Sequence, residues 1–143
     1  MRLLGKILNI LVIGIYALCG LALLVFAIPD SGLTAKSVQT GSMQPAISTG
    51  SLVIIQKTPL SQLQIGDVIT FINSKSTVTH RIIAAETKSG IPFFTTKGDA
   101  NAAPDPQVVG GRVQGKVIVA LPLAGYAVDF MRSIYGLALA IYL

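Results

Sequence analysis

The sequence predicts a mainly β fold, in which a compact antiparallel β-domain follows an N-terminal transmembrane helix and precedes a C-terminal hydrophobic segment. Three observations predict it: an uncharged apolar run near the start, short β-rich segments separated by turn residues in the middle, and an apolar end. The mean hydropathy of +0.69 and the charged fraction of 12% also indicate membrane residence. Ordinary globular domains carry roughly 25% charged residues.

The N-terminal apolar run, residues 7–28, contains no charged side chain. About twenty apolar residues in a helix cross a bilayer core, whereas the apolar part of a removable signal peptide is shorter. No small-x-small cleavage site follows before Pro29, so a retained transmembrane helix is predicted. Residues 1–6 carry two basic side chains, and the positive-inside rule therefore places them in the cytoplasm and everything after Asp30 outside it.

The middle of the chain, residues 37–122, follows a linker at 29–36 and consists of short β-rich runs. Glycine and proline separate these runs, and no helical apolar period of useful length lies between them. One compact antiparallel β-domain is therefore expected. Its predicted strands cover 51–55, 68–72, 77–84, 93–97 and 113–121.

The tail, residues 123–143, is apolar on both sides of Asp129 and Arg132. Each apolar piece is too short to span a bilayer alone. Two interpretations stay open at this point. The tail is either an interfacial amphipathic segment or an incomplete second transmembrane span.

Composition and motif content exclude several classes of function. The net charge of +5 comes from basic residues scattered singly, without a basic run, so no nucleic-acid partner is expected. The single cysteine, Cys19, lies inside the apolar run and offers no intramolecular disulfide. With one histidine and no nucleotide-binding glycine loop, the chain is expected to hold no metal and no cofactor.

A serine, the histidine and several carboxylates remain for chemistry. Strand alternation places Val78, His80 and Ile82 on one face, where partial desolvation favours a neutral imidazole that accepts a proton. A buried structural histidine is the alternative. Ser42 follows Gly41, which permits close backbone approach, but an ordinary turn serine fits that local pattern as well.

Two further carboxylates, Asp99 and Asp105, lie in a turn directly after the predicted 93–97 strand. Such residues often satisfy their own backbone in Asx-turns. The two roles are compatible, since one carboxylate can shape the loop while the other orients the imidazole.

Taken in order, these segments resemble the sequence boxes of signal peptidase I, in the branch of archaea, the endoplasmic reticulum and sporulating Gram-positive bacteria. Each box alone is a modest signal, and the resemblance comes from five boxes with compatible spacing. Housekeeping bacterial members carry a lysine base at the position of His80, so the resemblance implies the Ser/His form. The matching stretches are 40–45, 50–55, 65–69, 78–81 and 97–101, with a similar tail at 115–126.

The resemblance implies a β-domain of the signal peptidase type and a role for each site residue. Ser42 is the implied nucleophile and His80 the general base. Asp105 matches the later aspartate of its box and is favoured as the partner of the imidazole, whereas Asp99 takes a structural or electrostatic role. The backbone N–H of Ser42 and the hydroxyl of Thr40 are the expected oxyanion donors.

The implied function is that of a membrane-bound serine endopeptidase that removes signal peptides from secretory precursors after small residues. Its implied partners are those precursors and membrane lipid, and accessory subunits stay undetermined. The implied location is the cell membrane, or the endoplasmic reticulum membrane in a eukaryote. A related self-cleaving regulator would carry a lysine base and no anchor. The alternative from another class is a non-catalytic membrane-tethered β-domain that binds a partner or assembles with other subunits.

Overall fold

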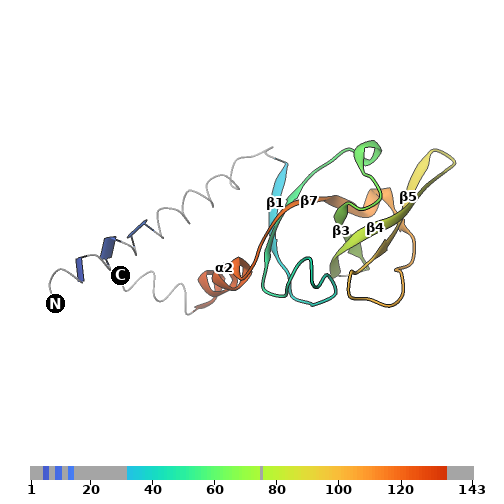
Figure 1. The fold of residues 1–143 in the computed structure, drawn as a ribbon. Helices are drawn as coiled ribbons and strands as arrows, with labels where there is room; N and C mark the ends of the chain where they lie inside the picture. Colours follow the sequence, from blue (N-terminus) through green and yellow to red (C-terminus); the bar gives the residue numbers. More distant parts are fainter. Residues whose placement is uncertain (1–4, 7–8, 11–12, 15–31, 75, 135–143) are drawn as a thin grey trace. The chain divides into compact units, whose positions relative to one another are not determined.

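The computed structural model describes residues 5–6, 9–10, 13–14, 32–74 and 76–134 (Figure 1). The chain separates into two compact units, Met1–Leu33 and Thr34–Leu143. Most of the predicted span at 7–28 lies outside the described residues, as does the last part of the tail. Among the residues that are described, no helix is both long and apolar enough to cross a membrane.

Seven strands form one sheet in the order β1-β2-β7-β3-β4-β5-β6. The pairings β2–β7, β7–β3, β3–β4, β4–β5 and β5–β6 are all antiparallel, so the predicted mainly β, antiparallel fold is confirmed. The strands are β1 (Leu33–Ser37), β2 (Leu52–Gln56), β3 (Val68–Asn73), β4 (Ser76–Lys88), β5 (Ile91–Lys97), β6 (Val108–Val109) and β7 (Val113–Leu121). The short helices η1 (Leu60–Gln62) and η2 (Gly110–Arg112) lie in the connections, and α2 (Ala124–Arg132) follows β7.

The strands at the two edges of the sheet differ from the sequence prediction. Residues 33–36, which the sequence assigned to a linker, form most of β1, and β6 was not predicted. Neither strand has the apolar alternation that marks a half-buried strand, because β1 contains mixed small and polar residues and β6 has only two residues. Both are edge strands whose pairing partner comes from elsewhere in the chain.

Buried apolar side chains form two separate cores on this sheet. Inward residues alternate along β2, β4 and β5, as the pleat requires. The central strands β3 and β7 contribute to both cores. The first core contains Leu63, Ile69, Phe71, Ile82, Phe94 and Val108, and the second contains Met43, Ile47, Val53 and Ile55.

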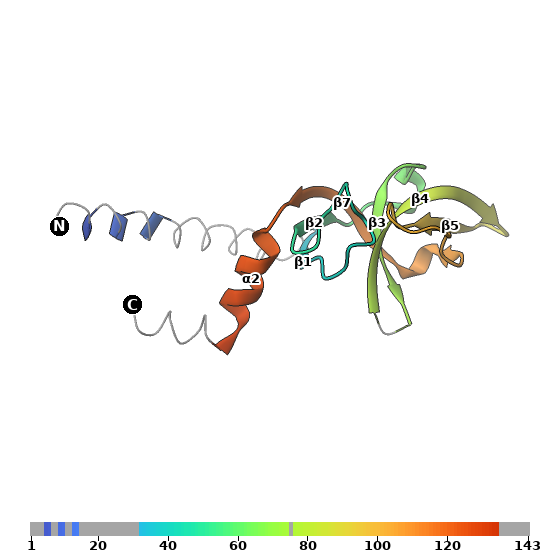
Figure 2. The same cartoon turned by 60° about the horizontal axis from the view of Figure 1, so that its bottom comes forward.

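Strand β7 lies between β2 and β3, as Figure 2 shows, and it contains Gly115. A Cβ atom at Gly115 would lie 2.4 Å from the backbone oxygen of Gln56, so this close approach excludes any side chain. The β2–β7 and β3–β7 registers both shift near this point. Such irregularities bend and twist a strand, which lets one sheet serve two cores.

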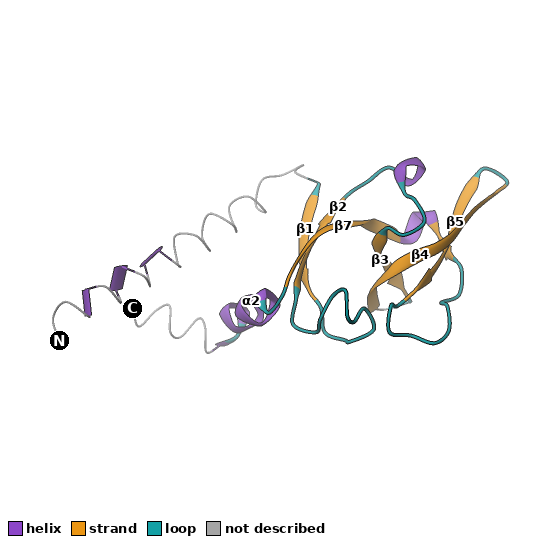
Figure 3. Cartoon of the chain, viewed as in Figure 1, coloured by secondary structure: helices purple, strands orange, loops and turns teal. Residues whose placement is uncertain are grey.

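Two long connections lie at the same end of the sheet and can be followed as teal loops in Figure 3. One joins β1 to β2 and carries Ser42, and the other joins β5 to β6 and carries Asp99 and Asp105. The backbone N–H of Ala100 donates to the backbone oxygen of Ser42 at 2.9 Å. The fold therefore brings the predicted site residues into one region.

Candidate active site

The loop between β1 and β2 holds Ser42 through burial of its neighbours. Met43 is 1% exposed and Ile47 5% exposed in the second core, so the loop is anchored by apolar side chains. The two ends of the loop are joined by hydrogen bonds from Val38 N–H to Ser51 O and from Gly50 N–H to Val38 O, both 2.8 Å. Ser42 directly precedes the buried methionine and stays partly exposed at the surface.

His80 lies on β4, opposite Ile69 in the register, and is 6% exposed. Its ring meets the Phe71 ring edge-on, with centroids 6.5 Å apart and an interplanar angle of 67°. Nε2 lies 3.0 Å from Ser42 Oγ, and Nδ1 lies 2.5 Å from Asp105 Oδ2. A carboxylate only accepts hydrogen bonds, so Nδ1–H donates to Asp105 and Nε2 faces the serine hydroxyl as an acceptor.

Asp105 is held against β5 by Thr96. The Asp105 backbone N–H donates to Thr96 O at 2.8 Å, and Thr96 Oγ1 donates to Asp105 Oδ2 at 2.8 Å. The same Oδ2 accepts from His80, so the carboxylate receives two side-chain donors on one oxygen. Thr96 is fully buried, whereas the Asp105 side chain is partly exposed.

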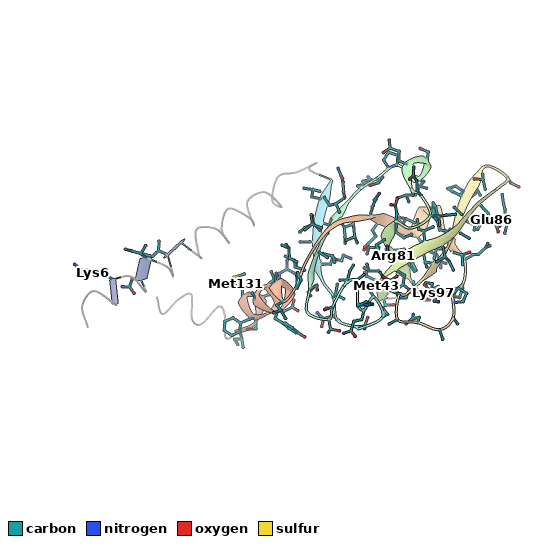
Figure 4. The ribbon with its side chains drawn as sticks, viewed as in Figure 1. Lys6, Met43, Arg81, Glu86, Lys97 and Met131 are labelled. Atoms are coloured by element: carbon teal, nitrogen blue, oxygen red, sulfur yellow. The ribbon has the colours of Figure 1, made fainter. Side chains whose placement is uncertain are left out.

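Asp99 pairs with Arg81. Arg81 Nε donates to Oδ1 at 2.9 Å and Nη2 donates to Oδ2 at 2.7 Å, which is a bidentate geometry. Arg81 Nη1 also donates to the backbone oxygen of Gly66 at 2.8 Å. The hydrogen bond from Arg81 holds the pKa of Asp99 below its ordinary value against the opposing effect of burial, and the same bond raises the pKa of Arg81. Figure 4 labels Arg81 and Lys97, which are partners in the β4–β5 register.

The turn that carries Asp99 also touches the main chain of the serine. Besides the bond from Ala100 to Ser42, a Cβ atom at Gly98 would lie 2.6 Å from the backbone oxygen of Ser42. Gly98 is buried, and its missing side chain permits this approach. Asp105 therefore contacts the imidazole, while the turn around Asp99 contacts the backbone of Ser42.

Thr40, the expected oxyanion helper, lies beside the serine. Its Oγ1 is 3.4 Å from Ser42 Oγ, a distance at the outer limit of a hydrogen bond. The Thr40 side chain is exposed, so its hydroxyl can turn toward another acceptor at this surface. Five residues named by the sequence, Thr40, Ser42, His80, Asp99 and Asp105, thus lie in one region of the structure.

Comparison with known proteins points to one enzyme family. Signal peptidase I W of Bacillus subtilis is 49% identical over 76 residues, which cover 52% of this chain and 40% of the relative. The signal peptidase complex catalytic subunit of Yarrowia lipolytica is 31% identical over 100 residues, covering 62% of this chain and 58% of that protein. Over these matched segments the chain is similar to signal peptidases. No protein-family model matches it.

The matched part spans about half the length of these two relatives, 40% of one and 58% of the other. The corresponding catalytic subunit of Neurospora crassa is 26% identical over 113 residues, which cover 71% of this chain and 66% of that protein. All three relatives bear the name signal peptidase, in agreement with the family suggested by the order of the sequence boxes.

Sequence reasoning assigned no role to two residues that contact the site. Thr96 carried a faint signal, because it is a polar side chain that alternates with Phe94 on the inward face of β5. Arg81 ends the 78–81 box, but nothing there indicated its partner, since Asp99 lies 18 residues away and is reached only through the β4–β5 pairing.

The charged residue of the 65–69 box, Asp67, also has a partner. Lys116 Nζ lies 2.6 Å from its Oδ1, and Gln64 N–H donates to its Oδ2 at 3.0 Å. Burial raises the pKa of Asp67, but the hydrogen bonds from Lys116 and Gln64 outweigh it, and the net pKa is lowered. This ion pair joins β7 to the turn before β3 and lies outside the Ser42–His80–Asp105 chain.

Proposed function

We propose that this chain is a signal peptidase, a serine endopeptidase that removes signal peptides from secretory precursors. The proposal rests above all on the continuous chain of hydrogen bonds from Ser42 Oγ through His80 to Asp105, with contacts of 3.0 Å and 2.5 Å. This is the serine–base–orienting group arrangement of nucleophilic catalysis. The named function of the relatives supports the choice of substrate class.

Acylation begins when Ser42 Oγ attacks the scissile carbonyl carbon while His80 Nε2 takes the hydroxyl proton. The new C–O bond moves the carbonyl π electrons onto oxygen and forms a tetrahedral intermediate. When this intermediate collapses, the C–N bond breaks and Nε2–H protonates the departing amine. The product is an acyl-enzyme ester on Ser42 and the free amino terminus of the mature protein.

Deacylation uses the same groups on a water molecule. Nε2 takes a proton from water as the water oxygen attacks the ester carbonyl carbon and forms a second tetrahedral intermediate. When this intermediate collapses, the bond between the acyl carbon and Ser42 Oγ breaks, and Nε2–H returns its proton to Oγ. The cleaved segment then leaves with a carboxylate end. Asp105 keeps Nδ1 protonated through both steps and stabilises the imidazolium that forms each time.

The proposed oxyanion donors are the backbone N–H of Ser42 and the hydroxyl of Thr40. Such donors act best when they are held in place before the charge develops. Burial of Met43 and the hydrogen bond from Ala100 to the Ser42 oxygen restrain the backbone next to the first donor. The Thr40 hydroxyl is close to the nucleophile and therefore near the carbonyl oxygen of a bound substrate.

The proposed setting is a membrane, either the cell membrane or that of the endoplasmic reticulum. Residues 7–28 would anchor the chain with residues 1–6 in the cytoplasm, and residues 37–122 would act on the far side. Residues 123–143 would lie at the interface or enter the bilayer. A site placed there meets signal peptides whose apolar segment is in the lipid and cuts them after small residues.

A precursor-cleavage assay on membranes containing the full chain tests this proposal. Ser42→Ala and His80→Ala should each lower the processing rate by at least about a thousandfold, since the two groups act as one unit. Asp105→Asn should lose more activity than Asp99→Asn, because only Asp105 contacts the imidazole. Circular dichroism of each variant controls for folding.

Near wild-type cleavage by Ser42→Ala or His80→Ala would rule out the Ser/His mechanism. A harmless Asp105→Asn beside an inactive Asp99→Asn would reverse the roles of the two carboxylates. A wild-type chain that binds precursors but cleaves none would leave the non-catalytic binding subunit as the better interpretation.

A further inference from the structure

We infer that Thr96 is a positioning residue of this site, whose hydroxyl orients the Asp105 carboxylate and through it the ring of His80. Thr96 is 0% exposed, and its Oγ1 donates to Asp105 Oδ2 at 2.8 Å. That same oxygen accepts the Nδ1–H of His80 at 2.5 Å. The catalytic consequence rests on the proposed function, whereas the orienting contact itself does not.

Thr96 holds Asp105 at two points. Its backbone oxygen accepts the Asp105 N–H at 2.8 Å, which fixes the main chain, and its hydroxyl fixes the carboxylate. The terminal torsion of an aspartate is broad, so the backbone contact alone leaves the two carboxylate oxygens free to rotate. The Asp105 side chain is 23% exposed, and water can reach a carboxylate that has rotated away.

The position of Thr96 is set by pairing with β4, the strand that also carries the histidine. Thr96 lies opposite Ile82 in the β4–β5 register, and Ile82 is two residues from His80 on the same face of β4. The hydroxyl and the imidazole thus both depend on β4, which pairs with β5 at Thr96 and with β3 at His80. The loop that carries Asp105 is not part of a strand, and the Asp105 carboxylate is oriented by its contacts with Thr96 and His80.

A buried hydroxyl in an apolar surrounding is unfavourable unless it is hydrogen-bonded. Valine has nearly the same shape as threonine and would fill this inward position next to Phe94 without a polar group. The role of the Thr96 hydroxyl is therefore the hydrogen bond that it donates to Asp105 Oδ2. Thr70 is the matched case, because it is also 0% exposed but its hydroxyl pairs with Thr79 Oγ1 at 2.9 Å.

The first test reads the imidazole directly and needs no substrate. His80 is the single histidine of the chain, so magnetic resonance of the full chain, labelled at histidine in detergent micelles, reports on one ring. The Nδ1–H signal should be kept in Thr96→Ser, which retains the hydroxyl. In Thr96→Val, which removes the hydroxyl, the Nδ1–H signal should shift or broaden through exchange with water. In the control Thr70→Val the signal should stay unchanged.

The second test measures kinetics on a secretory precursor. Thr96→Val should lower kcat about ten- to a hundredfold with little change in KM, because a displaced imidazole slows chemistry while Thr96 touches no substrate. Thr96→Ser should stay within about threefold of wild type. If Thr96→Val fails to fold, Thr96→Ala against Thr96→Ser gives the same comparison, since both lack the methyl group.

The outcomes separate the two proposals. An unchanged Nδ1–H signal and unchanged kcat in Thr96→Val, with lower stability in Thr96→Ser, would mean that Thr96 only packs, and would overturn the inference. A changed signal in Thr96→Val together with no cleavage by wild type would support the orienting role and reject the peptidase proposal.

Discussion

The two cores of this sheet hold the two halves of the site in different ways. His80 lies on β4, whose inward neighbour Ile82 belongs to the first core, and Phe94 of that core lies on the adjacent β5. Ser42 lies in a loop next to Met43 of the second core. The base is thus placed by strand register, and the nucleophile by a loop whose apolar side chain is buried.

This difference shows where alignment of the site depends on long-range contacts. Groups on regular strands are held more rigidly than groups on loops, which generally rely on specific anchors. Here the anchors are the burial of Met43, the close contact of Gly98 and the bond from Ala100 to Ser42. The Arg81–Asp99 ion pair ties that anchoring turn back to β4.

The largest expected effect on stability comes from truncating a large buried side chain in either core. Phe94→Ala in the first core should lower the free energy of unfolding by about 3–5 kcal/mol, and Met43→Ala in the second by about 2–5 kcal/mol. Thermal unfolding in detergent, followed by circular dichroism, measures both. Because one sheet joins the cores, each variant should unfold in a single transition. Two transitions, with Met43→Ala moving just one, would show that the cores are independent.

A smaller effect is expected where the anchoring turn meets the serine. The added methyl group of Gly98→Ala would push against the Ser42 oxygen and the Asn101 side chain, lowering the free energy of unfolding by about 1–3 kcal/mol and reducing precursor cleavage. Gly111→Ala is the control, because nothing lies within 4 Å of its added Cβ atom. Equal behaviour of the two variants in both assays would remove Gly98 from the anchoring role.

The smallest expected effect is the pH dependence of the Arg81–Asp99 pair. Folding lowers the pKa of Asp99, so its contribution is complete above the ordinary aspartate value of about 4 and is lost as the pH falls through the lowered pKa. Asp99→Asn should cost on the order of 1 kcal/mol at neutral pH and flatten the stability curve below about pH 4. Unfolding midpoints measured across this range test it.

Asp129→Asn is the matched control for this pH dependence. Its carboxylate accepts hydrogen bonds from the neutral side chains of Ser37 and Gln39 and has no ion pair among the described residues. A stability curve for Asp99→Asn that keeps the full wild-type slope below pH 4 would show that the ion pair does not contribute in the folded state.

Much of the fold could be read from local pattern. Alternation of apolar residues predicted the strands that became β2, β3, β4, β5 and β7, and it placed His80 on the inward face of β4. β1 and β6 were missed because edge pairing gives them their structure, not their own residues. The predicted anchor at 7–28 stays a prediction, as do the roles of the site residues.

The sequence established which groups were available: one histidine, a serine inside the 40–45 box, two nearby carboxylates and an apolar run long enough to cross a bilayer. The residues by themselves did not decide which carboxylate meets the imidazole, and only the family resemblance favoured Asp105 over Asp99. The tertiary structure turns Asp99 toward Arg81 and lets Asp105 reach His80 beside Thr96. Local conformational preferences act over a few residues of sequence. Ser42 and His80 are 38 residues apart and meet only through sheet register and loop packing, so their contact depends on the tertiary structure.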